Sequence, residues 1–425
     1  MTYHKEITKD SKEAYTTQTP IAPGGHIQGM PMNRIERLPV TVLAGFLGAG
    51  KTTLLSHVLN NREGLRVAVI VNDMSEVNID ASLIRDGGCN LSHTTEALVE
   101  LSNGCICCTL RNDLLTEVRR LAEEGRYDYL LIEGTGIAEP RPIAATFSFR
   151  DENGVSLSDF ARLDTMVTVV DAANLLADYG TADLLADRGL QRDGEDRRTL
   201  IDLLVDQIEF ADIVVINKIS DATEEIRAEV RKIVASLNPD ARQVETDLGK
   251  VSLAAVLNTG LFDEEKAAAH PLWHKELYSP GEHVPETEEY GVSSFVYRTR
   301  RPFDPKRFRA FLDEPWPGVL RAKGHFWLAT RPRHVGLMSA AGVQRRCEPM
   351  GLWWAAVPRQ DWPNHQQFQQ HLQSRWDSAW GDRRQELVFI GVGMDETGVR
   401  TALDDCLASA DPRDWADLED PFPAW

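Results

Sequence analysis

The stretch GFLGAGKTT, residues 45–53, decides how the rest of this 425-residue sequence is interpreted. It fits the pattern G-x-x-x-x-G-K-[ST] with Gly45, Gly50, Lys51 and Thr52. The apolar run 40–43 precedes it, and residues 53–60 after it are predicted to form a helix. Glycines let the backbone curl so that several N–H groups point at one anion, and the helix adds its positive N-terminal end. A strand, a glycine loop and a helix in this order predict a phosphate-binding loop.

The polar residues of this loop have defined roles in a nucleotide site. Lys51 reaches the β- and γ-phosphate oxygens, and the Thr52 hydroxyl ligates Mg²⁺. The predicted strand 129–136 brings Glu133 and then Gly136 to the carboxyl edge of the same sheet. An acidic residue there can orient the water on Mg²⁺, and a glycine N–H can sense the γ-phosphate. We therefore predict that Lys51, Thr52 and Glu133 are catalytic residues of a nucleoside triphosphatase.

The predicted strand 213–218 ends in the residues that would read the base. In guanine-specific proteins with this loop the position reads Asn-Lys-x-Asp, and the carboxylate accepts two hydrogen bonds from the guanine ring. Asn217 and Lys218 fit, but Ser220 stands where the aspartate belongs, and Asp221 follows one position late. We predict GTP as the nucleotide. Either Asp221 turns toward the base or the preference for guanine is weakened.

Strands and helices alternate along the first 260 residues. Further strands are predicted at 67–73 and 166–172, and helices at 114–125 and 224–238. Strands that are apolar on both faces and separated by helices indicate a parallel sheet covered on both sides. The polar stretches 148–162 and 177–199 are predicted to be surface insertions. The predicted fold class is α/β, a P-loop domain with a mostly parallel, doubly wound sheet.

The composition divides the chain into five parts. We predict a flexible tail, the P-loop domain, an acidic linker, a smaller α+β domain and a C-terminal tail at residues 1–37, 38–259, 260–290, 291–410 and 411–425. The linker has only three histidines, His270, His274 and His283. In the second domain we predict strands at 293–299, 325–331 and 387–393 and helices at 305–313 and 396–407.

Charge and hydropathy exclude several classes of partner. The net charge is −19, which repels nucleic-acid phosphates and anionic lipid surfaces, so we expect neither nucleic acid nor membrane as a partner. No apolar run approaches the ~18 residues of a membrane span. The first 20 residues have no apolar core, so they do not match a secretory signal. We expect a cytoplasmic protein.

Half of the six cysteines cluster in NGCICCTLR, residues 103–111. Cys105, Cys107 and Cys108 do not form a core pattern. A C-x-x-C redox pair is present, but the flanking sequence is that of a P-loop domain and not of a thioredoxin-like fold. Thiolates favour Zn²⁺ and other soft or borderline cations. Acidic residues that could complete such a site are Asp73, Glu76 and Asp80.

Several segments together resemble the CobW-type metallochaperone GTPases, which are relatives of the nickel-insertion GTPases. They are GFLGAGKTTLL, VNDMSEVNID, LSNGCICCTLRNDL, IEGTGIAEP, TVVDA and the block RAKGHFWLATRP…QELVFIGVGMD. The resemblance covers about residues 38–410. The segment EHVPETEEYGVSSFVYRTRRPFDP is similar to the branch with zinc chaperones and proteins labelled nitrile hydratase activators. The resemblance implies GTP hydrolysis coupled to loading Zn²⁺, or Co²⁺ in the cobalamin branch, into a client metalloprotein.

The resemblance also assigns individual residues to a nucleotide site and a metal site. The nucleotide-binding set is Gly45, Gly48, Gly50, Lys51, Thr52, Thr53, Gly136, Asn217 and Lys218. The metal set is Cys105, Cys107 and Cys108, with Glu76 as a helper. The implied cofactors are GTP, Mg²⁺ and Zn²⁺. The histidine run between the domains, often dense in this family, is short here, so bulk metal storage is not expected.

The expected mechanism is a switch in which nucleotide and metal are linked ligands. GTP and Mg²⁺ order segment 73–80 and the cysteine loop and gather the thiolates, and hydrolysis relaxes both and releases the metal. No arginine finger is evident beyond the weak possibility of Arg111. Three alternatives stay open: a cobalt-delivery or nitrile hydratase activator GTPase, a non-catalytic zinc sensor or buffer, and a small-molecule P-loop kinase.

Overall fold

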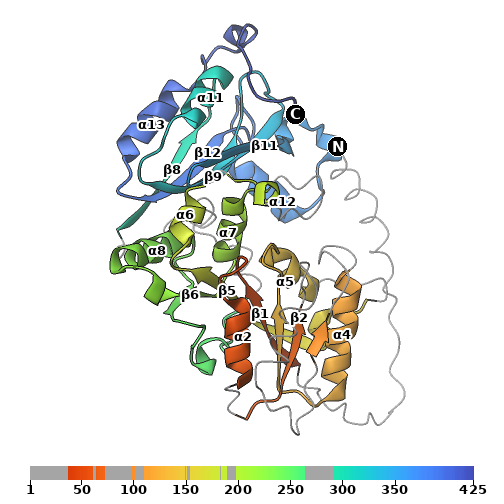
Figure 1. The fold of residues 1–425 in the computed structure, drawn as a ribbon. Helices are drawn as coiled ribbons and strands as arrows, with labels where there is room; N and C mark the ends of the chain where they lie inside the picture. The colour runs from red at the N-terminus through yellow and green to blue at the C-terminus, as the bar shows by residue number, and fades with distance from the viewer. Residues whose placement is uncertain are drawn as a thin grey trace, which may run out of the picture. The chain divides into compact units, whose positions relative to one another are not determined.

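The computed structural model describes residues 37–60, 64–71, 98–100, 110–148, 150, 154–181, 183–188, 198–263 and 291–425. These residues form two sheets, one of seven strands and one of five, each with its own helices (Figure 1). Residues 1–36 of the expected tail 1–37 and residues 264–290 of the expected linker 260–290 lie outside the described residues. None of the helices within the described ranges is long and apolar enough to cross a membrane.

The first sheet is parallel throughout, as the alternating pattern predicted. Its spatial order is β3-β2-β4-β1-β5-β6-β7. The strands are β1 (Leu38–Ala44), β2 (Val67–Val71), β3 (Leu98–Glu100), β4 (Tyr129–Glu133), β5 (Ala161–Asp171), β6 (Ile213–Asn217) and β7 (Arg242–Glu245). Every strand pair in it is parallel, so the carboxyl ends of all seven strands lie along one edge. The predicted doubly wound α/β class is confirmed.

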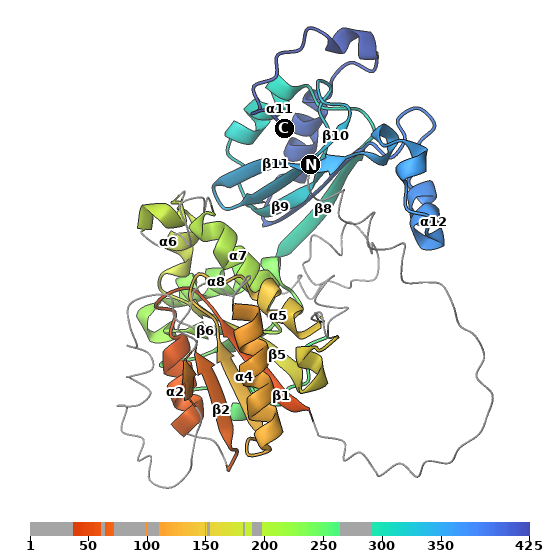
Figure 2. The same ribbon diagram turned by 90° about the vertical axis from the view of Figure 1, so that its right-hand side faces the viewer.

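Helices cover both faces of this sheet. They are α2 (Lys51–Asn60), α4 (Leu110–Glu124), α5 (Pro140–Ser148), α6 (Leu175–Tyr179), α7 (Leu200–Glu209) and α8 (Glu224–Leu237). Alternate residues of a strand point to opposite faces. Val40 and Val42 accordingly pack with α4 and α5, whereas Leu43 packs with α2 on the other face. Figure 2 shows these helices beside the strands of the first sheet. Helices α7 and α8 pack on Val214 and Ile216 of β6.

Three helices of this domain, α5, α6 and α7, were not predicted. Helix α7 falls at the end of a charged insertion, yet it starts with a complete capping box in which Thr199 and Asp202 exchange side-chain and backbone hydrogen bonds. Its sequence, LIDLLVDQIE, is apolar on most of its surface, and eight of its ten residues are buried. The helix is amphipathic, with Asp202, Asp206 and Glu209 at helical spacing on one face, but no helix was predicted after the expected insertion 177–199.

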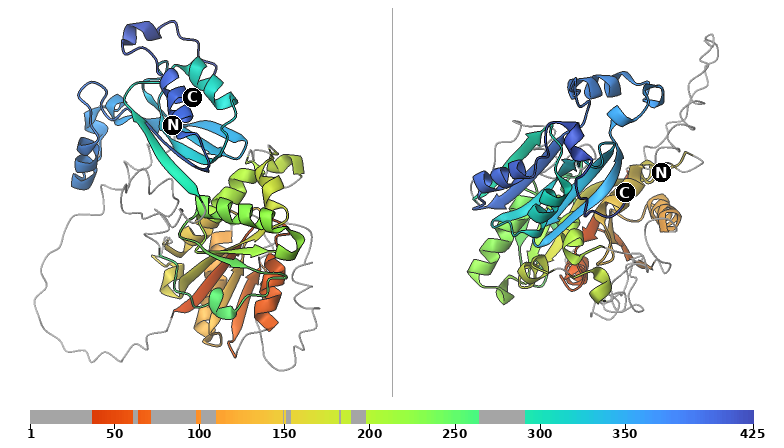
Figure 3. Two further views of the ribbon diagram at one scale, coloured as in Figure 1. Left: turned by 90° about the vertical axis from the view of Figure 1, so that its left-hand side faces the viewer. Right: turned by 90° about the horizontal axis from the view of Figure 1, so that it is seen from above.

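The second sheet is antiparallel, in the order β11-β10-β9-β12-β8. Its elements are β8 (Val292–Thr299), α11 (Pro305–Asp313), β9 (Val319–Phe326), β10 (His334–Ala341), β11 (Gln344–Leu352), α12 (Gln366–Ser374), β12 (Gln385–Val392) and α13 (Glu396–Asp405). Helices α11 and α13 cover one face over an aromatic core (Figure 3). This confirms the predicted smaller α+β domain.

One predicted strand of the second domain is displaced. We expected a strand at 325–331, but β9 ends at Phe326. The backbone N–H of Trp327 instead donates to the side-chain oxygen of Gln385, and Ala329 bonds to Phe303. The C-terminal residues pack back on this domain, where Phe422 joins the aromatic core and Asp420 pairs with Arg331 at 2.8 Å.

Short 3₁₀ turns complete the fold. They span Leu157–Asp159, Leu185–Arg188, Ile219–Asp221, Leu253–Ala255, Trp354–Ala356, Arg359–Asp361 and Pro412–Trp415. The turn at Ile219–Asp221 follows the end of β6 directly and belongs to the predicted base-reading segment.

Candidate functional site

The glycine loop lies between the end of β1 and the start of α2, where two of its glycines have no room for a side chain. Gly45 has a φ of +135°, and a Cβ there would lie 2.3 Å from the carbonyl oxygen of Val169. Gly50 has a φ of +107°, and its Cβ would lie 2.2 Å from the amide nitrogen of Asn217. Only glycine suits these positions, because other residues avoid positive φ and would clash. The phosphate-binding shape is therefore fixed by packing against β5 and β6.

The predicted catalytic residues come together at this loop. Lys51 is buried and donates from Nζ to the carbonyl oxygen of Phe46 at 3.2 Å, which folds its side chain back over the loop. Thr52 donates from Oγ1 to Oε1 of Glu133 at 3.2 Å. Glu133 is the last residue of β4, which pairs with β1 in parallel and brings the carboxylate beside the loop. A hydroxyl and a carboxylate in contact are the hard oxygen donors that Mg²⁺ prefers. These two side chains would hold the Mg²⁺ of a bound nucleotide.

The segment after Glu133 packs closely on the glycine loop. The N–H of Gly134 donates to the carbonyl of Leu43 at 2.9 Å. A Cβ on Gly136 would lie 2.5 Å from the side chain of Leu47, so Gly136 also has no space for a larger residue. The structure thus places Gly136 against the predicted phosphate-binding loop, where we expected a glycine N–H to respond to a γ-phosphate.

Helix α7 holds this segment from outside. Gln207 is 1% exposed, and its side-chain amide donates to the carbonyls of Gly136 at 3.4 Å and Ala138 at 3.1 Å. Arg198, just before α7, donates to the carbonyl of Ile137 and pairs with Glu139 at 2.9 Å. The sequence reasoning missed Gln207. The only available signal was a polar residue inside an apolar helix.

The residues predicted to read the base, Asn217 and Lys218, lie on the opposite side of the loop. Asn217 is 2% exposed; its amide donates to the carbonyl of Ala49 at 2.9 Å, and its oxygen accepts from the N–H of Gly249 at 3.0 Å. Lys218 has a φ of +61° and pairs through Nζ with Asp171 at 2.7 Å. Asn217 therefore joins three chain segments that are far apart in the sequence.

Asp171 was not predicted as a site residue, although it ends the conspicuous strand β5. Burial raises the pKa of its carboxyl group, but the hydrogen bonds from Lys218 and Asn174 outweigh burial and hold the pKa below its usual value. A cavity of about 300 Å³ runs along residues 46–49 and is lined by Asp171 and Lys218. Asp171 thus stays ionised and fixes the lysine beside this cavity.

The predicted metal residues cannot be located in the same way. Glu76, Cys105, Cys107 and Cys108 lie outside the described residues, as do Asp73 and Asp80. Within the described ranges, no group of three or more His, Cys, Asp or Glu side chains could hold a metal ion. Cys347 and Cys406 are free cysteines there, and burial raises the pKa of each thiol to about 12. Both are therefore thiols at neutral pH, which makes them poor metal ligands.

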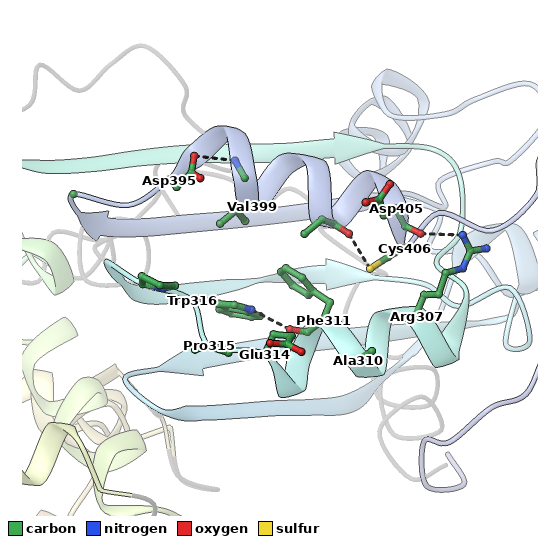
Figure 4. Close-up of a pocket in the computed structure, with 14 residues that line it drawn as sticks. Arg307, Ala310, Phe311, Glu314, Pro315, Trp316, Asp395, Val399, Asp405 and Cys406 are labelled. Atoms are coloured by element: carbon green, nitrogen blue, oxygen red, sulfur yellow. Dashed lines mark hydrogen bonds between the residues drawn. The ribbon is translucent and has the colours of Figure 1, made fainter.

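A second cavity, of about 520 Å³, lies in the C-terminal domain between α11 and α13 (Figure 4). Phe311, Trp316 and Val399 supply apolar walls, and Arg307 reaches the carbonyl of Asp405 at its rim. The Cys406 thiol donates to the carbonyl of Ala402. The groups lining this cavity form no metal site, and the nucleotide chemistry belongs to the first domain.

Helices α6 and α7 of the first domain also contact the second sheet. Arg321 of β9 pairs with Glu209 of α7 at 2.7 Å, and these side chains are 3% and 6% exposed. The hydroxyl of Tyr179 donates to the carbonyl of Leu320 at 2.7 Å, and Arg346 pairs with Asp202 at 2.8 Å. A buried ion pair of this kind is costly to break. Helix α7 therefore contacts residues 136–138 through Gln207 and the second domain through Glu209.

Comparison with known proteins agrees with this geometry. The model of the CobW/HypB/UreG nucleotide-binding domain matches residues 39–245, and that of the cobalamin synthesis protein CobW C-terminal domain matches residues 292–407. The zinc-regulated GTPase metalloprotein activator 1 of Dictyostelium discoideum is 46% identical over 88% of this chain and 80% of its own length. The zinc chaperone CobW of a Sinorhizobium species is 31% identical over 86% of this chain and 96% of that protein. The zinc chaperone YjiA of Escherichia coli is 27% identical over 86% and 98%, respectively. This chain therefore belongs to the CobW/HypB/UreG family of P-loop GTPases, and the CobW C-terminal domain follows its nucleotide-binding domain.

Proposed function

We propose that this GTPase is a zinc metallochaperone, which binds Zn²⁺ through Cys105, Cys107 and Cys108 and delivers it to a client metalloprotein. The observation that carries the proposal is the contact of Thr52 with Glu133 at the carboxyl edge of the parallel sheet. The cysteine segment joins the end of β3 to the start of α4, and the segment with Glu76 follows the end of β2. Both segments thus leave the sheet at the edge where the glycine loop lies.

The order of strands supports a link between nucleotide and metal. Strands β3, β2, β4 and β1 are neighbours, so the connections after them start side by side along one edge. We propose that GTP tightens the metal site and that hydrolysis loosens it. Bound Mg²⁺ would supply the positive charge that offsets the charge developing on the phosphates. The residues of this chain have the complementary tasks: Lys51 holds phosphate oxygens, and Glu133 orients the metal-bound water.

The second domain would sense the nucleotide through α7. Gln207 holds the carbonyl of Gly136, and two residues later Glu209 pairs with Arg321 of the second sheet. A shift of the Gly136 segment on hydrolysis would therefore act on the helix that bears the buried ion pair. We propose that the second domain recognises the client and that this helix couples recognition to the nucleotide state.

The test is the affinity for Zn²⁺, measured by competition with a chelating dye with and without Mg²⁺ and a non-hydrolysable GTP analogue. We expect the analogue to tighten Zn²⁺ binding by about 5- to 150-fold, the usual range of coupling between two sites. Linkage requires that Zn²⁺ tighten the binding of the analogue by the same factor. Agreement of the two factors would establish the coupling independently of any client.

Two cysteine variants make the experiment specific. Cys107→Ala should abolish the gain from the nucleotide. Cys347→Ala removes a thiol whose pKa is raised by burial in the second domain, and it should leave the gain intact. Zinc affinity that ignores the nucleotide would exclude delivery by hydrolysis and favour a static zinc buffer. A larger effect of the analogue on Co²⁺ than on Zn²⁺ would favour cobalt as the cargo.

A further inference from the structure

The carboxylate that reads guanine is missing from its usual place in this chain. Ser220 occupies the position after Asn217, Lys218 and Ile219 where an aspartate is expected. The structure shows what Ser220 does there. Its backbone N–H and its hydroxyl both donate to Oδ1 of Asp247, each at 2.9 Å. A carboxylate from another loop, 27 residues further along the chain, thus lies against the vacant position.

The loop that carries Asp247 is held firmly. It follows β7, and the N–H of Thr246 donates to the carbonyl of Ile216 at 2.9 Å. The N–H of Gly249 donates to Asn217, the residue that also grips the glycine loop at Ala49. A Cβ on Gly249 would lie 2.7 Å from the Cα of Leu54, so this loop packs directly on α2. Asp247 therefore has a fixed position relative to the phosphate site.

Two further features mark this loop as a base site. A carboxylate has about four acceptor positions, and Ser220 occupies two at Asp247, which leaves two for a ligand. Among the described residues, no side chain donates to its second oxygen. Next to it, Leu248 has a φ of +53° and is 62% exposed. A large apolar side chain held outward in a left-handed conformation costs free energy, and such strain concentrates where ligands bind. A flat aromatic ring, such as that of a base, would cover the exposed Leu248 side chain.

We propose that Asp247 is the specificity-determining residue for guanine in this GTPase, with Ser220 as its positioning residue. Guanine presents an N1–H and an N2 amino group as two donors side by side, which can both be accepted at Oδ2, the oxygen of Asp247 that Ser220 leaves open. Adenine has no N1–H, so it would leave the carboxylate unpaired.

Asp221 is the competing carboxylate, and its surroundings are less suitable. It is exposed, and within the described residues only its backbone N–H is bonded, to the carbonyl of Lys218. A side chain without a fixing partner loses conformational entropy when it binds a ligand. Asp247 has already lost that entropy through Ser220, so binding through Asp247 costs less.

The experiment changes the hydrogen-bonding groups at position 247 and tests whether the preferred base changes with them. In Asp247→Asn the amide should reject guanine and accept xanthine, whose 2-oxo group replaces the amino group. We would measure the Kd of fluorescent mant-GDP and mant-XDP for the wild type, Asp247→Asn and the matched control Asp221→Asn. We expect Asp247→Asn to weaken mant-GDP by about 100-fold or more and to prefer mant-XDP, because an unpaired polar group in a site built for hydrogen bonds is strongly rejected. Asp221→Asn should keep the preference of the wild type.

Ser220→Ala provides a second measurement that does not depend on Asp247→Asn. Without the Ser220 hydroxyl, Asp247 keeps the hydrogen bond from the backbone N–H of residue 220. We expect mant-GDP to bind about 5- to 10-fold more weakly, which corresponds to the free energy of one hydrogen bond. A switch to mant-XDP in Asp221→Asn, or in neither aspartate variant, would overturn the proposal. So would full mant-GDP affinity in Ser220→Ala. The inference rests on guanine nucleotide binding alone, and zinc coupling could fail without affecting it.

Discussion

The two sheets of this protein differ in what fills their cores. All ten tryptophans lie after residue 272, and the core of the second sheet consists largely of stacked aromatic rings. The core of the first sheet is mainly Val, Ile and Leu. A parallel sheet covered on both sides suits branched aliphatic residues, and its single carboxyl edge gathers the polar loops. The antiparallel sheet has no such edge, so its buried polar residues, such as Gln385, hold structure rather than ligands.

The largest expected effect on stability comes from removing an aromatic side chain from the core of the second sheet. Phe308 is fully buried and stacks on Phe303 at 4.4 Å between centroids. Phe308→Ala should lower the free energy of unfolding by about 3–5 kcal/mol because it leaves a cavity. Urea unfolding followed by tryptophan fluorescence checks this, since every tryptophan lies after residue 272.

The matched variant in the first core is Leu121→Ala in α4, where the side chain is 1% exposed. It should cost about 2–5 kcal/mol, observed by far-ultraviolet circular dichroism. If the tryptophan transition moves equally in both variants, the contacts of α7 make the two cores one cooperative unit. If it moves only for Phe308→Ala, the two cores unfold separately.

Changing Glu133 at the carboxyl edge of the first sheet should slow GTP hydrolysis without unfolding the protein. Glu133→Gln keeps the shape of the side chain and its contact with Thr52 but removes the charge that we propose orients the Mg²⁺ ligands. We expect kcat for GTP hydrolysis to fall by about 10²- to 10³-fold, as when one stabilising group of an active site is lost. Phosphate release under saturating GTP measures it. A rate within threefold of the wild type would exclude a catalytic role for Glu133.

A smaller effect is expected from changing Gln207, because this residue of α7 connects the carboxyl edge of the first sheet to the helix that contacts the second domain. Gln207→Leu leaves two buried carbonyls, those of Gly136 and Ala138, without this donor, at a cost of about 1–3 kcal/mol. The Kd of a GTP analogue should rise relative to that of GDP, because the segment near the γ-phosphate loses its support. Gln243→Leu is the control, since Gln243 donates to one carbonyl, that of Arg231, away from this segment. Equal effects of both variants on the ratio would contradict the link.

The smallest predicted effect is a pH dependence from the second sheet. Burial, and then the charge of Arg384, lower the pKa of His325 to about 4. An unfolded histidine titrates near 6.5, so the unfolded state binds more protons between pH 6.5 and 4, and stability falls as the pH falls through that window. His325 is partly exposed, so we expect about 1 kcal/mol of this dependence to disappear in His325→Gln. Urea midpoints by tryptophan fluorescence at pH 7 and pH 5 measure it, and an unchanged difference would exclude His325 as its source.

The accuracy of sequence reasoning also differed between the two sheets. In the first, continuous apolar runs predicted β1, β2, β4, β5 and β6, because each strand is buried along nearly all of its length. In the second, β10 and β11 were missed. The sequences HVGLMSAA and QRRCEPMGL show no clear alternation, and β11 lies at the sheet edge, half-buried or exposed throughout. An edge strand gains its order from backbone pairing, which leaves little trace in side-chain pattern.

The sequence by itself determined the phosphate loop, its catalytic partners Lys51, Thr52 and Glu133 as predictions, and the parallel sheet that presents them. These depend on motifs and apolar runs within about ten residues, where local conformation and side-chain chemistry suffice. Only the tertiary structure decided that Asp247 lies against Ser220, that Gln207 holds the Gly136 segment, and that Glu209 pairs with Arg321. These contacts join residues 27, 71 and 112 positions apart. Such contacts exist only after the chain has packed, because the free energy that closes loops of this length comes from the buried core and not from the local sequence.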